Sequence, residues 1–282
     1  MSGLQLPQGA TVTIQKRFRP PAMDLADFYK TGHFGMYPEG MEFLQSNWTP
    51  RGSRIEGIDR VVFYGLQAFI QHVLEDEFGR LFTEEGEQML TDHKATVTGG
   101  LGVDFSVNHW AELRKLGYLP LKFSALPEGT EVPLRVPMFI VENTVPGYGW
   151  LVNYIESILS NNIWQGMTSA TIALKFRRLL DHWAALTSDT PEFVDWQGHD
   201  FSFRGMPGVD AAAASGSGHL LSFAGSDTLP AIGWAKAHYG ALAFVGGSVF
   251  ATEHSVMCAG GKDDEIQTFV RLLTTYPKGI LS

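Results

Sequence analysis

The pattern of apolar and polar positions predicts a chain of mixed helices and strands. Apolar residues keep helical spacing over residues 60–78, and this stripe predicts a helix with one buried face. Residues 121–125 alternate apolar and polar side chains, and residues 138–141 are continuously apolar, which is typical of strands. The segment Pro-Glu-Gly at residues 127–129 predicts a turn between them. We therefore expect a small sheet in the first half of the chain.

Two further helices are expected before residue 190, and a different rhythm follows them. Apolar spacing predicts helices over residues 150–159 and 168–186, which should pack together. From about residue 193 strand-like and helix-like segments alternate, an order that favours parallel βαβ units. The expected strands are residues 193–196, 220–224 and 248–252, and the expected helices are residues 228–239 and 263–275.

Composition and charge narrow the class of protein. The 282 residues are 44% hydrophobic and 18% charged, as in a folded chain rather than a disordered tail or a membrane protein. No apolar run approaches the ~20 residues that span a bilayer, and the start of the chain lacks an export signal. The net charge of −9 does not suit a general nucleic-acid binder, and the single cysteine, Cys258, excludes an internal disulfide framework. We expect a cytoplasmic protein with neither nucleic-acid nor membrane partners.

The chain lacks the common nucleotide and hydrolase motifs, but three polar clusters follow expected strands. It contains no G-x-x-x-x-G-K-[ST], H-E-x-x-H, C-x-x-C or G-x-S-x-G pattern. The clusters are residues 199–205, 225–228 and 246–255, and functional residues of α/β barrels lie at the carboxyl ends of strands. Structural alternatives are a polar loop for the first, a helix cap at Asp227 for the second and a structural role for His254 in the third.

Several segments in register resemble the nicotinamide phosphoribosyltransferase family. They are residues 27–33 (DFYKTGH), 62–67 (VFYGLQ), 141–144 (VENT), 199–205 (HDFSFRG), 225–228 (GSDT) and 253–255 (EHS). The resemblance covers residues 24–282 and implies an α/β fold, namely a β/α barrel of the type II phosphoribosyltransferase kind with an added α+β N-terminal domain. We expect three parts: a flexible arm over residues 1–22, the N-terminal domain with dimer-forming helices over 23–190, and the first half of a truncated barrel over 191–282.

The resemblance implies a reaction of NAD salvage. Phosphoribose passes from 5-phosphoribosyl 1-diphosphate to nicotinamide, which gives nicotinamide mononucleotide and diphosphate. Mg²⁺ accompanies the diphosphate substrate, ATP is an activating phosphoryl donor, and a homodimer places the site at its interface. The family continues beyond residue 282 with phosphate-binding residues, so we expect this chain to be a fragment. The alternatives are a nicotinate phosphoribosyltransferase and a non-catalytic chain that binds pyridines or complements another chain.

The resemblance also assigns roles to residues. Phe201 and Tyr29 match the two aromatic residues that sandwich the pyridine ring, one of which comes from the partner subunit. Asp227 and His254 are the catalytic candidates: Asp227 matches the aspartate that accepts the carboxamide N–H and repels the carboxylate of nicotinate, and His254 matches the histidine phosphorylated by ATP. The other substrate-binding matches are Arg204 beside the ring and product phosphate, Ser248 and Val249 in the ring pocket, His199 near its mouth, and Arg51, which reaches the diphosphate from the other subunit. The resemblance assigns no metal-ligating residue. Ser202 departs from the family, which commonly has glycine there.

Overall fold

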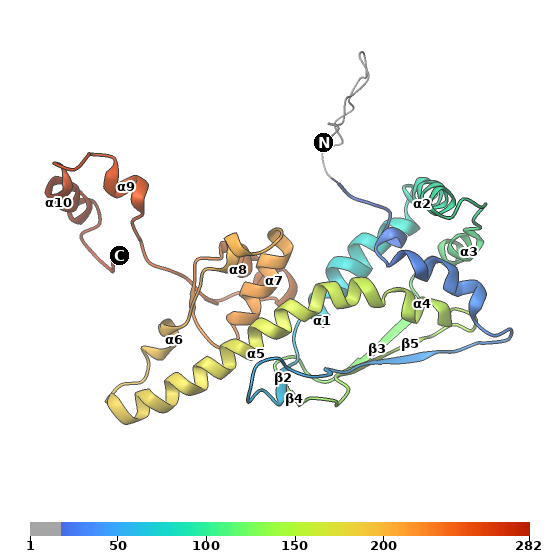
Figure 1. Ribbon diagram of the computed structural model, residues 1–282, viewed down its shortest axis with the longest axis horizontal. Helices are drawn as coiled ribbons and strands as arrows, with labels where there is room; N and C mark the ends of the chain where they lie inside the picture. The colour runs from blue at the N-terminus through green and yellow to red at the C-terminus, as the bar shows by residue number, and fades with distance from the viewer. Residues whose placement is uncertain (1–17) are drawn as a thin grey trace, which may run out of the picture.

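A computed structural model of the chain describes residues 18–282 (Figure 1). Its first part contains a three-stranded antiparallel sheet in the order β1–β5–β3 and a two-stranded antiparallel pair, β2 and β4. The strands are β1 (Gln45–Trp48), β2 (Arg60–Val62), β3 (Leu121–Ala125), β4 (Glu131–Pro133) and β5 (Phe139–Asn143). The predicted small sheet is confirmed, because β3 and β5 fall on the two segments that the apolar pattern singled out.

The helix expected over residues 60–78 begins later than predicted. Residues 60–62 form β2, and Gly65, with a φ of 102°, makes the left-handed turn before α1 (Leu66–Phe69). Two further helical segments, η3 (Ile70–Glu77) and η4 (Phe78–Phe82), continue the path of α1. The apolar stripe is buried as predicted, but its first residues pair as a strand with β4 instead of extending the helix.

The helices expected over residues 150–159 and 168–186 are divided differently. The structure has a short α4 (Gly149–Tyr154) and a 32-residue α5 (Glu156–Thr187), separated only at Ile155. The expectation of two helices packed together is therefore wrong, because Ile158 and Leu159 belong to the same helix as residues 168–186. Helix α5 runs along the whole centre of the molecule and contacts elements on both sides (Figure 1).

Aromatic and aliphatic side chains fill one main core in the first part. This core lies between the β1–β5–β3 sheet, α4, the start of α5, the segments α1, η3 and η4, and four further helices that precede β3 in the chain. Those helices are η1 (Ala22–Asp24), η2 (Phe28–Met36), α2 (Gly86–Leu101) and α3 (Asn108–Leu116). The largest fully buried side chains of this core include Trp110, Phe63, Phe69, Phe78 and Leu151. Burial of each such side chain contributes about 1.5–3 kcal/mol to folding.

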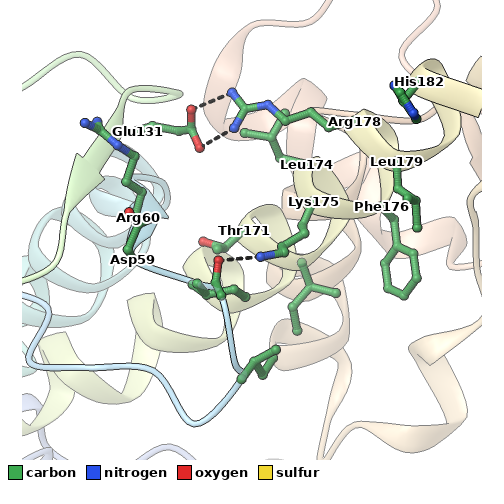
Figure 2. A pocket seen from close by; sticks show the side chains of 14 residues that line it. Asp59, Arg60, Glu131, Thr171, Leu174, Lys175, Phe176, Arg178, Leu179 and His182 are labelled. Atoms are coloured by element: carbon green, nitrogen blue, oxygen red, sulfur yellow. Dashed lines mark hydrogen bonds and ion pairs between the residues drawn. The ribbon is translucent and has the colours of Figure 1, made fainter.

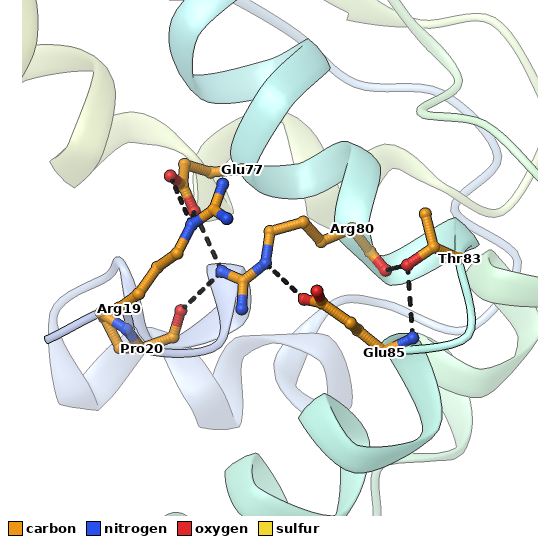
Figure 3. A network of polar contacts seen from close by, with 6 residues as sticks. All are labelled: Arg19, Pro20, Glu77, Arg80, Thr83 and Glu85. Carbon is orange, nitrogen blue, oxygen red and sulfur yellow. Dashed lines mark hydrogen bonds and ion pairs between the residues drawn. The ribbon is translucent and has the colours of Figure 1, made fainter. Parts of the chain in front are cut away.

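A network of ion pairs fixes the beginning of the described chain (Figure 3). Glu77 accepts hydrogen bonds from Arg19 and from Arg80, each at 3.0 Å, and Arg80 also donates to Glu85 at 2.8 Å and to the carbonyl oxygen of Pro20 at 3.3 Å. Burial opposes ionisation of Glu77, but the two guanidinium groups outweigh it and lower its pKa. Of the flexible arm expected over residues 1–22, residues 1–17 lie outside the part of the chain that the structure describes.

The second part contains parallel strands, but they are short and displaced from the predicted positions. Strand β6 (His199–Asp200) pairs in parallel with β7 (Gly225–Ser226), and Gly225 forms a parallel bridge with Gly247. Helix α7 (Val209–His219) connects β6 to β7, and α8 (Leu229–Tyr239) follows β7. The predicted parallel βαβ order is thus confirmed. The predicted strands are wrong in detail: residues 194–197 form helix α6 (Val194–Gln197), residues 220–224 form a turn, and residues 248–252 contribute only a bridge at Phe250.

The described residues form no closed barrel. Three short parallel segments lie side by side, and the chain then leads away to α9 (His254–Cys258) and α10 (Glu265–Thr275), which project from the rest of the molecule (Figure 1). The structure therefore supports a mixed α/β fold and does not confirm a truncated barrel. None of the helices within residues 18–282 combines the length and apolar character needed to cross a membrane.

Candidate functional site

The side chains of three predicted site residues meet at the ends of the parallel segments. The ring Nε2 of His199 lies 2.6 Å from Oδ2 of Asp227, and Oγ of Ser248 donates to the same carboxylate at 3.1–3.2 Å. His199 belongs to β6, Asp227 directly follows β7, and Ser248 directly follows the bridge at Gly247. Side chains 28 positions before and 21 positions after Asp227 thereby converge on its carboxylate.

Backbone hydrogen bonds hold this carboxylate in place. The Asp227 N–H donates to the carbonyl oxygen of Asp200 at 2.9 Å, and the Ser226 N–H donates to that of Gly247 at 2.9 Å. Gly225 leaves room for the imidazole, because a Cβ atom at this position would lie 2.6 Å from Nδ1 of His199. The backbone hydrogen bonds and the absence of a Cβ atom at Gly225 therefore fix the contact between His199 and Asp227.

Behind the strands, His219 supports the same two segments. Its Nε2 lies 3.3 Å from the carbonyl oxygen of Gly198 and 3.1 Å from that of Gly225. Carbonyl oxygens only accept, so Nε2 carries the proton and donates to both. Burial lowers the pKa of His219, which favours the neutral ring. The imidazole thus joins the start of β7 to the residue before β6.

Phe201 presents an open aromatic face next to this cluster. Its ring centroid lies 4.7 Å from that of His199 with an interplanar angle of 33°, and 65% of the residue is exposed. The Asp200 carboxylate accepts the N–H of Ser202 at 3.1 Å and so shapes the turn that carries Phe201. Val249 is 41% exposed, and Arg204 in η5 (Ser202–Gly205) is also exposed. The exposed Phe201 ring and the exposed Arg204 side chain therefore lie three positions apart in the chain, next to the contact between His199 and Asp227.

The structural alternative for Asp227 is wrong. Thr228 is the N-cap residue of α8, and no side chain makes a capping hydrogen bond there. The carboxylate of Asp227 instead contacts His199 and Ser248 and keeps 43% of its side chain exposed. A partly solvated carboxylate with a fixed orientation is suited to accept a hydrogen bond from a ligand.

Tyr29 and Arg51 lie elsewhere on the molecule. Tyr29 is 62% exposed in η2, which packs against α4, whereas Phe201 directly precedes η5, which packs against α7. Arg51 lines a cavity of about 670 Å³ between β1, β5, α4 and the start of α5. Within residues 18–282, no ring contact joins Tyr29 to Phe201. The chain therefore brings His199, Phe201, Asp227 and Ser248 together, with Val249 next to Ser248 in the sequence, and no hydrogen bond, ion pair or ring contact joins Tyr29 or Arg51 to this group in the described part of the chain.

His254 is also separate from the carboxylate. It begins α9 and is exposed, and its neighbour Ser255 donates a short hydrogen bond to Glu253. In the part of the chain that the structure describes, the His254 ring has neither a hydrogen bond nor an ion pair. The ring nitrogens are thus open to a reagent from solvent.

Helix α5 borders several cavities, which differ in whether they include predicted site residues. A cavity of about 350 Å³ is bordered by His199, Asp200 and Ser202 on one side and by α5 on the other. A larger cavity of about 680 Å³ lies between α5 and residues 55–60, where Arg178 pairs with Glu131 through bonds of 2.6 and 2.8 Å (Figure 2). It contains none of the predicted site residues. Among residues 18–282, no group of three or more His, Cys, Asp or Glu side chains is arranged to hold a metal ion.

The supporting roles of Gly225 and His219 were not predicted from the sequence, although Gly225 lies in the polar cluster at residues 225–228. Gly225 and His219 act through space and backbone contacts, so no side-chain motif marks them. The only signal was the position of Gly225 at the end of an expected strand, within the GSDT segment.

Comparisons with known proteins give a consistent result. Two family models match: "Nicotinamide phosphoribosyltransferase, N-terminal domain" over residues 22–110, and "Nicotinate phosphoribosyltransferase (NAPRTase) family" over residues 196–278. A nicotinamide phosphoribosyltransferase of Acinetobacter baylyi is 46% identical over 273 residues, which cover 94% of this chain and 54% of that protein. One of Mycoplasma pneumoniae is 35% identical over 272 residues, which cover 91% and 57%. The chain thus spans about half the length of the curated relatives it matches.

A solved structure shows a similar fold. The crystal structure of human nicotinic acid phosphoribosyltransferase superposes with a TM-score of 0.52 at 19% sequence identity. The match covers 83% of this chain and 40% of the human chain. At this identity the similarity concerns the fold.

Proposed function

The chain belongs to the nicotinamide phosphoribosyltransferase family, and on this premise we propose that it serves the transfer of phosphoribose from 5-phosphoribosyl 1-diphosphate to nicotinamide. The products are nicotinamide mononucleotide and diphosphate, as in NAD salvage. The observation that carries the proposal is the Asp227 carboxylate, held by His199 and Ser248 beside the exposed ring of Phe201.

The chemistry of these groups suits nicotinamide. A pyridine ring that stacks on Phe201 gains affinity from aromatic contact. An ionised carboxylate accepts the carboxamide N–H of nicotinamide and repels the carboxylate of nicotinate, so Asp227 gives selectivity for the amide. Ser248 and His199 donate to Asp227 and keep its oxygens oriented, while Val249 adds apolar contact. Arg204 supplies a guanidinium for the ring face and the phosphate of the product.

We assign ATP and Mg²⁺ to this reaction as well. His254 accepts the phosphoryl group of ATP, since its exposed ring has no competing partner within the described residues. Mg²⁺ enters with the diphosphate, whose oxygens and water supply its ligands.

We propose further that two copies of the chain form each site. Tyr29 and Arg51 lie on a different face from Phe201, so they serve the site of a second copy in a homodimer. The proposed boundary between the two parts lies near residue 190, where α5 has ended and α6 has not begun. The proposed location is the cytoplasm, in accord with a single cysteine.

The proposal is tested by two measurements on the same preparation. Calorimetric titration with nicotinamide and with nicotinate measures ring binding, and we expect nicotinamide to bind more tightly. Incubation with nicotinamide, 5-phosphoribosyl 1-diphosphate and Mg²⁺, with and without ATP, is followed by chromatography of nicotinamide mononucleotide. Product formation supports the transferase. Tight nicotinamide binding without product favours the non-catalytic pyridine-binding chain, and preference for nicotinate would contradict the role of Asp227.

A further inference from the structure

Lys30, the neighbour of Tyr29 in the sequence, is a buried lysine. Only 3% of its side chain is exposed. Its Nζ donates to the carbonyl oxygen of Asn153 at 2.9 Å and to Oε2 of Glu156 at 2.7 Å. The same Nζ lies over the ring of Tyr29, 5.5 Å from the ring centroid. An ammonium group has three N–H donors, so two hydrogen bonds and one aromatic face account for its surroundings.

These contacts connect η2 to the junction of α4 and α5. Asn153 lies in the last turn of α4, and Glu156 is the first residue of α5. The Glu156 side chain is 58% exposed and lines the same cavity as Arg51. The Lys30–Glu156 pair therefore connects the ring of Tyr29 with the cavity that Arg51 borders, and both residues belong to the face assigned to the second copy.

A role in packing alone is a poor explanation for this lysine. Removal of an ammonium group from water is costly, and an apolar side chain of similar length would fill the same space without that cost. An ammonium group does what an apolar side chain does not: it attracts the face of an aromatic ring and so restricts its orientation. Tyr29 remains 62% exposed, which leaves the ring accessible for a second stacking partner.

We propose that Lys30 is a positioning residue that orients the Tyr29 ring for stacking on the pyridine of the substrate, and that Glu156 holds its ammonium group in place. The inference rests on the proposed function, because Tyr29 has a ligand only if the chain binds a pyridine. It goes beyond that function by naming a residue that acts through Tyr29 and does not itself touch the substrate.

The test is a double-mutant cycle on nicotinamide binding, measured by calorimetry with the full chain. The variants are Lys30→Met, Tyr29→Ala and the double substitution. We expect Lys30→Met to weaken binding about tenfold when Tyr29 is present and less than about twofold when Tyr29 is alanine. Lys30→Arg, which keeps a cation near the ring, should stay within about threefold of the wild type.

A matched control separates positioning from the general loss of an ion pair. Lys122 makes an ion pair with Glu142 at the same distance, 2.7 Å, but is 59% exposed. Lys122→Met should leave nicotinamide affinity unchanged. Equal weakening by Lys30→Met with and without Tyr29 would overturn the positioning role, as would unchanged binding in Lys30→Met.

A second measurement needs no ligand. The ε-methylene protons of Lys30 should show an upfield ring-current shift in NMR spectra of lysine-labelled protein, and Tyr29→Ala should abolish it. If the wild-type chain binds no nicotinamide, the proposed function fails, and this shift alone decides whether Lys30 holds the ring. Its absence would overturn the contact itself.

Discussion

Asp227 presents a carboxylate whose orientation is set by two donors, His199 and Ser248. We expect Asp227→Ala to weaken nicotinamide binding about 10- to 100-fold, since hydrogen bonds to a charged group contribute about 1.5–3 kcal/mol. Nicotinate binding should improve, because the like charge that repels it is gone. Parallel titrations with both ligands measure the change. Asp181→Ala removes an exposed carboxylate that pairs with Arg177 and is the control. Unchanged selectivity would refute the role of Asp227.

The exposed imidazole of His254 offers a second prediction. If His254 accepts the phosphoryl group of ATP, His254→Ala should abolish the stimulation of product formation by ATP and leave the basal rate within about twofold. Product formation with and without ATP measures this. His182 on α5 is also an exposed histidine, so His182→Ala is the matched control and should keep the full response to ATP. A stimulation that survives His254→Ala would transfer the phosphoryl acceptor to another residue.

A buried histidine in the core predicts a dependence of stability on pH. Burial lowers the pKa of His109 to about 4, with a smaller contribution from His93. The unfolded ring has a pKa of about 6.5, so between pH 6.5 and 4 the unfolded state binds more protons than the folded state. The free energy of unfolding therefore decreases as the pH is lowered through this range. At pH 5 the loss from His109 is about 2 kcal/mol relative to pH 7.5. Denaturant titrations of the wild type and of His109→Phe measure it, because the variant removes this titration while keeping a ring against Phe34.

The contact between β6 and β7 depends on one small residue. In Gly225→Ala the new Cβ atom would meet Nδ1 of His199 at 2.6 Å and the carbonyl oxygen of Gly198 at 3.0 Å. We expect the imidazole to move and its bond to Asp227 to break, with a loss of about 1–3 kcal/mol of stability from overpacking. Thermal unfolding and nicotinamide titration report the two effects. Gly233→Ala on α8 meets no atom within 4 Å and should stabilise the helix by about 0.5–1 kcal/mol.

Among the elements, the sequence pattern located the helices whose apolar spacing is local. It misplaced the strands, whose positions depend on pairing with segments distant in the sequence. Helices α8 and α10 fall within two residues of the predicted starts, since their apolar spacing is internal to each segment. Residues 193–196 failed as a strand: Val194 is buried, whereas Phe193 and Trp196 are 42% and 47% exposed, a pattern that one helical turn satisfies. The ladder forms nearby at β6 and β7, because Gly198 and Gly225 let side chains of neighbouring segments approach closely.

The same distinction applies to the candidate site. Polar clusters after strand-like segments predicted that residues near 199, 227 and 248 would matter, and the structure brings His199, Asp227 and Ser248 into hydrogen-bond contact. The supporting roles of His219 and Lys30 were not predictable, because each depends on carbonyl oxygens from distant segments. The resemblance implied that one of the two aromatic residues comes from the partner subunit, whereas the separation of Tyr29 from Phe201 within one chain required three-dimensional placement.

At the scale of the molecule, the proposed site residues fall into two sets. One set surrounds Asp227, and the other consists of Tyr29 in η2 and Arg51, which borders the cavity at β1 and α5. In the proposed homodimer, two-fold symmetry would let such sets meet twice, so each site would take one set from each copy. The proposal accounts for the two exposed rings of the described chain, Phe201 and Tyr29, which do not contact each other.

Mixing of two defective variants tests this arrangement. Tyr29→Ala and Asp227→Ala each damage one set, so each homodimer has two defective sites. Random exchange of subunits gives half heterodimers, and each heterodimer has one site with both substitutions and one site with neither, so about a quarter of all sites recover. Calorimetric titration of the mixture should therefore show tight nicotinamide binding at about a quarter of the wild-type stoichiometry after joint refolding, and none when the variants are mixed without exchange. If each site were built within a single chain, the refolded mixture would recover no site at all.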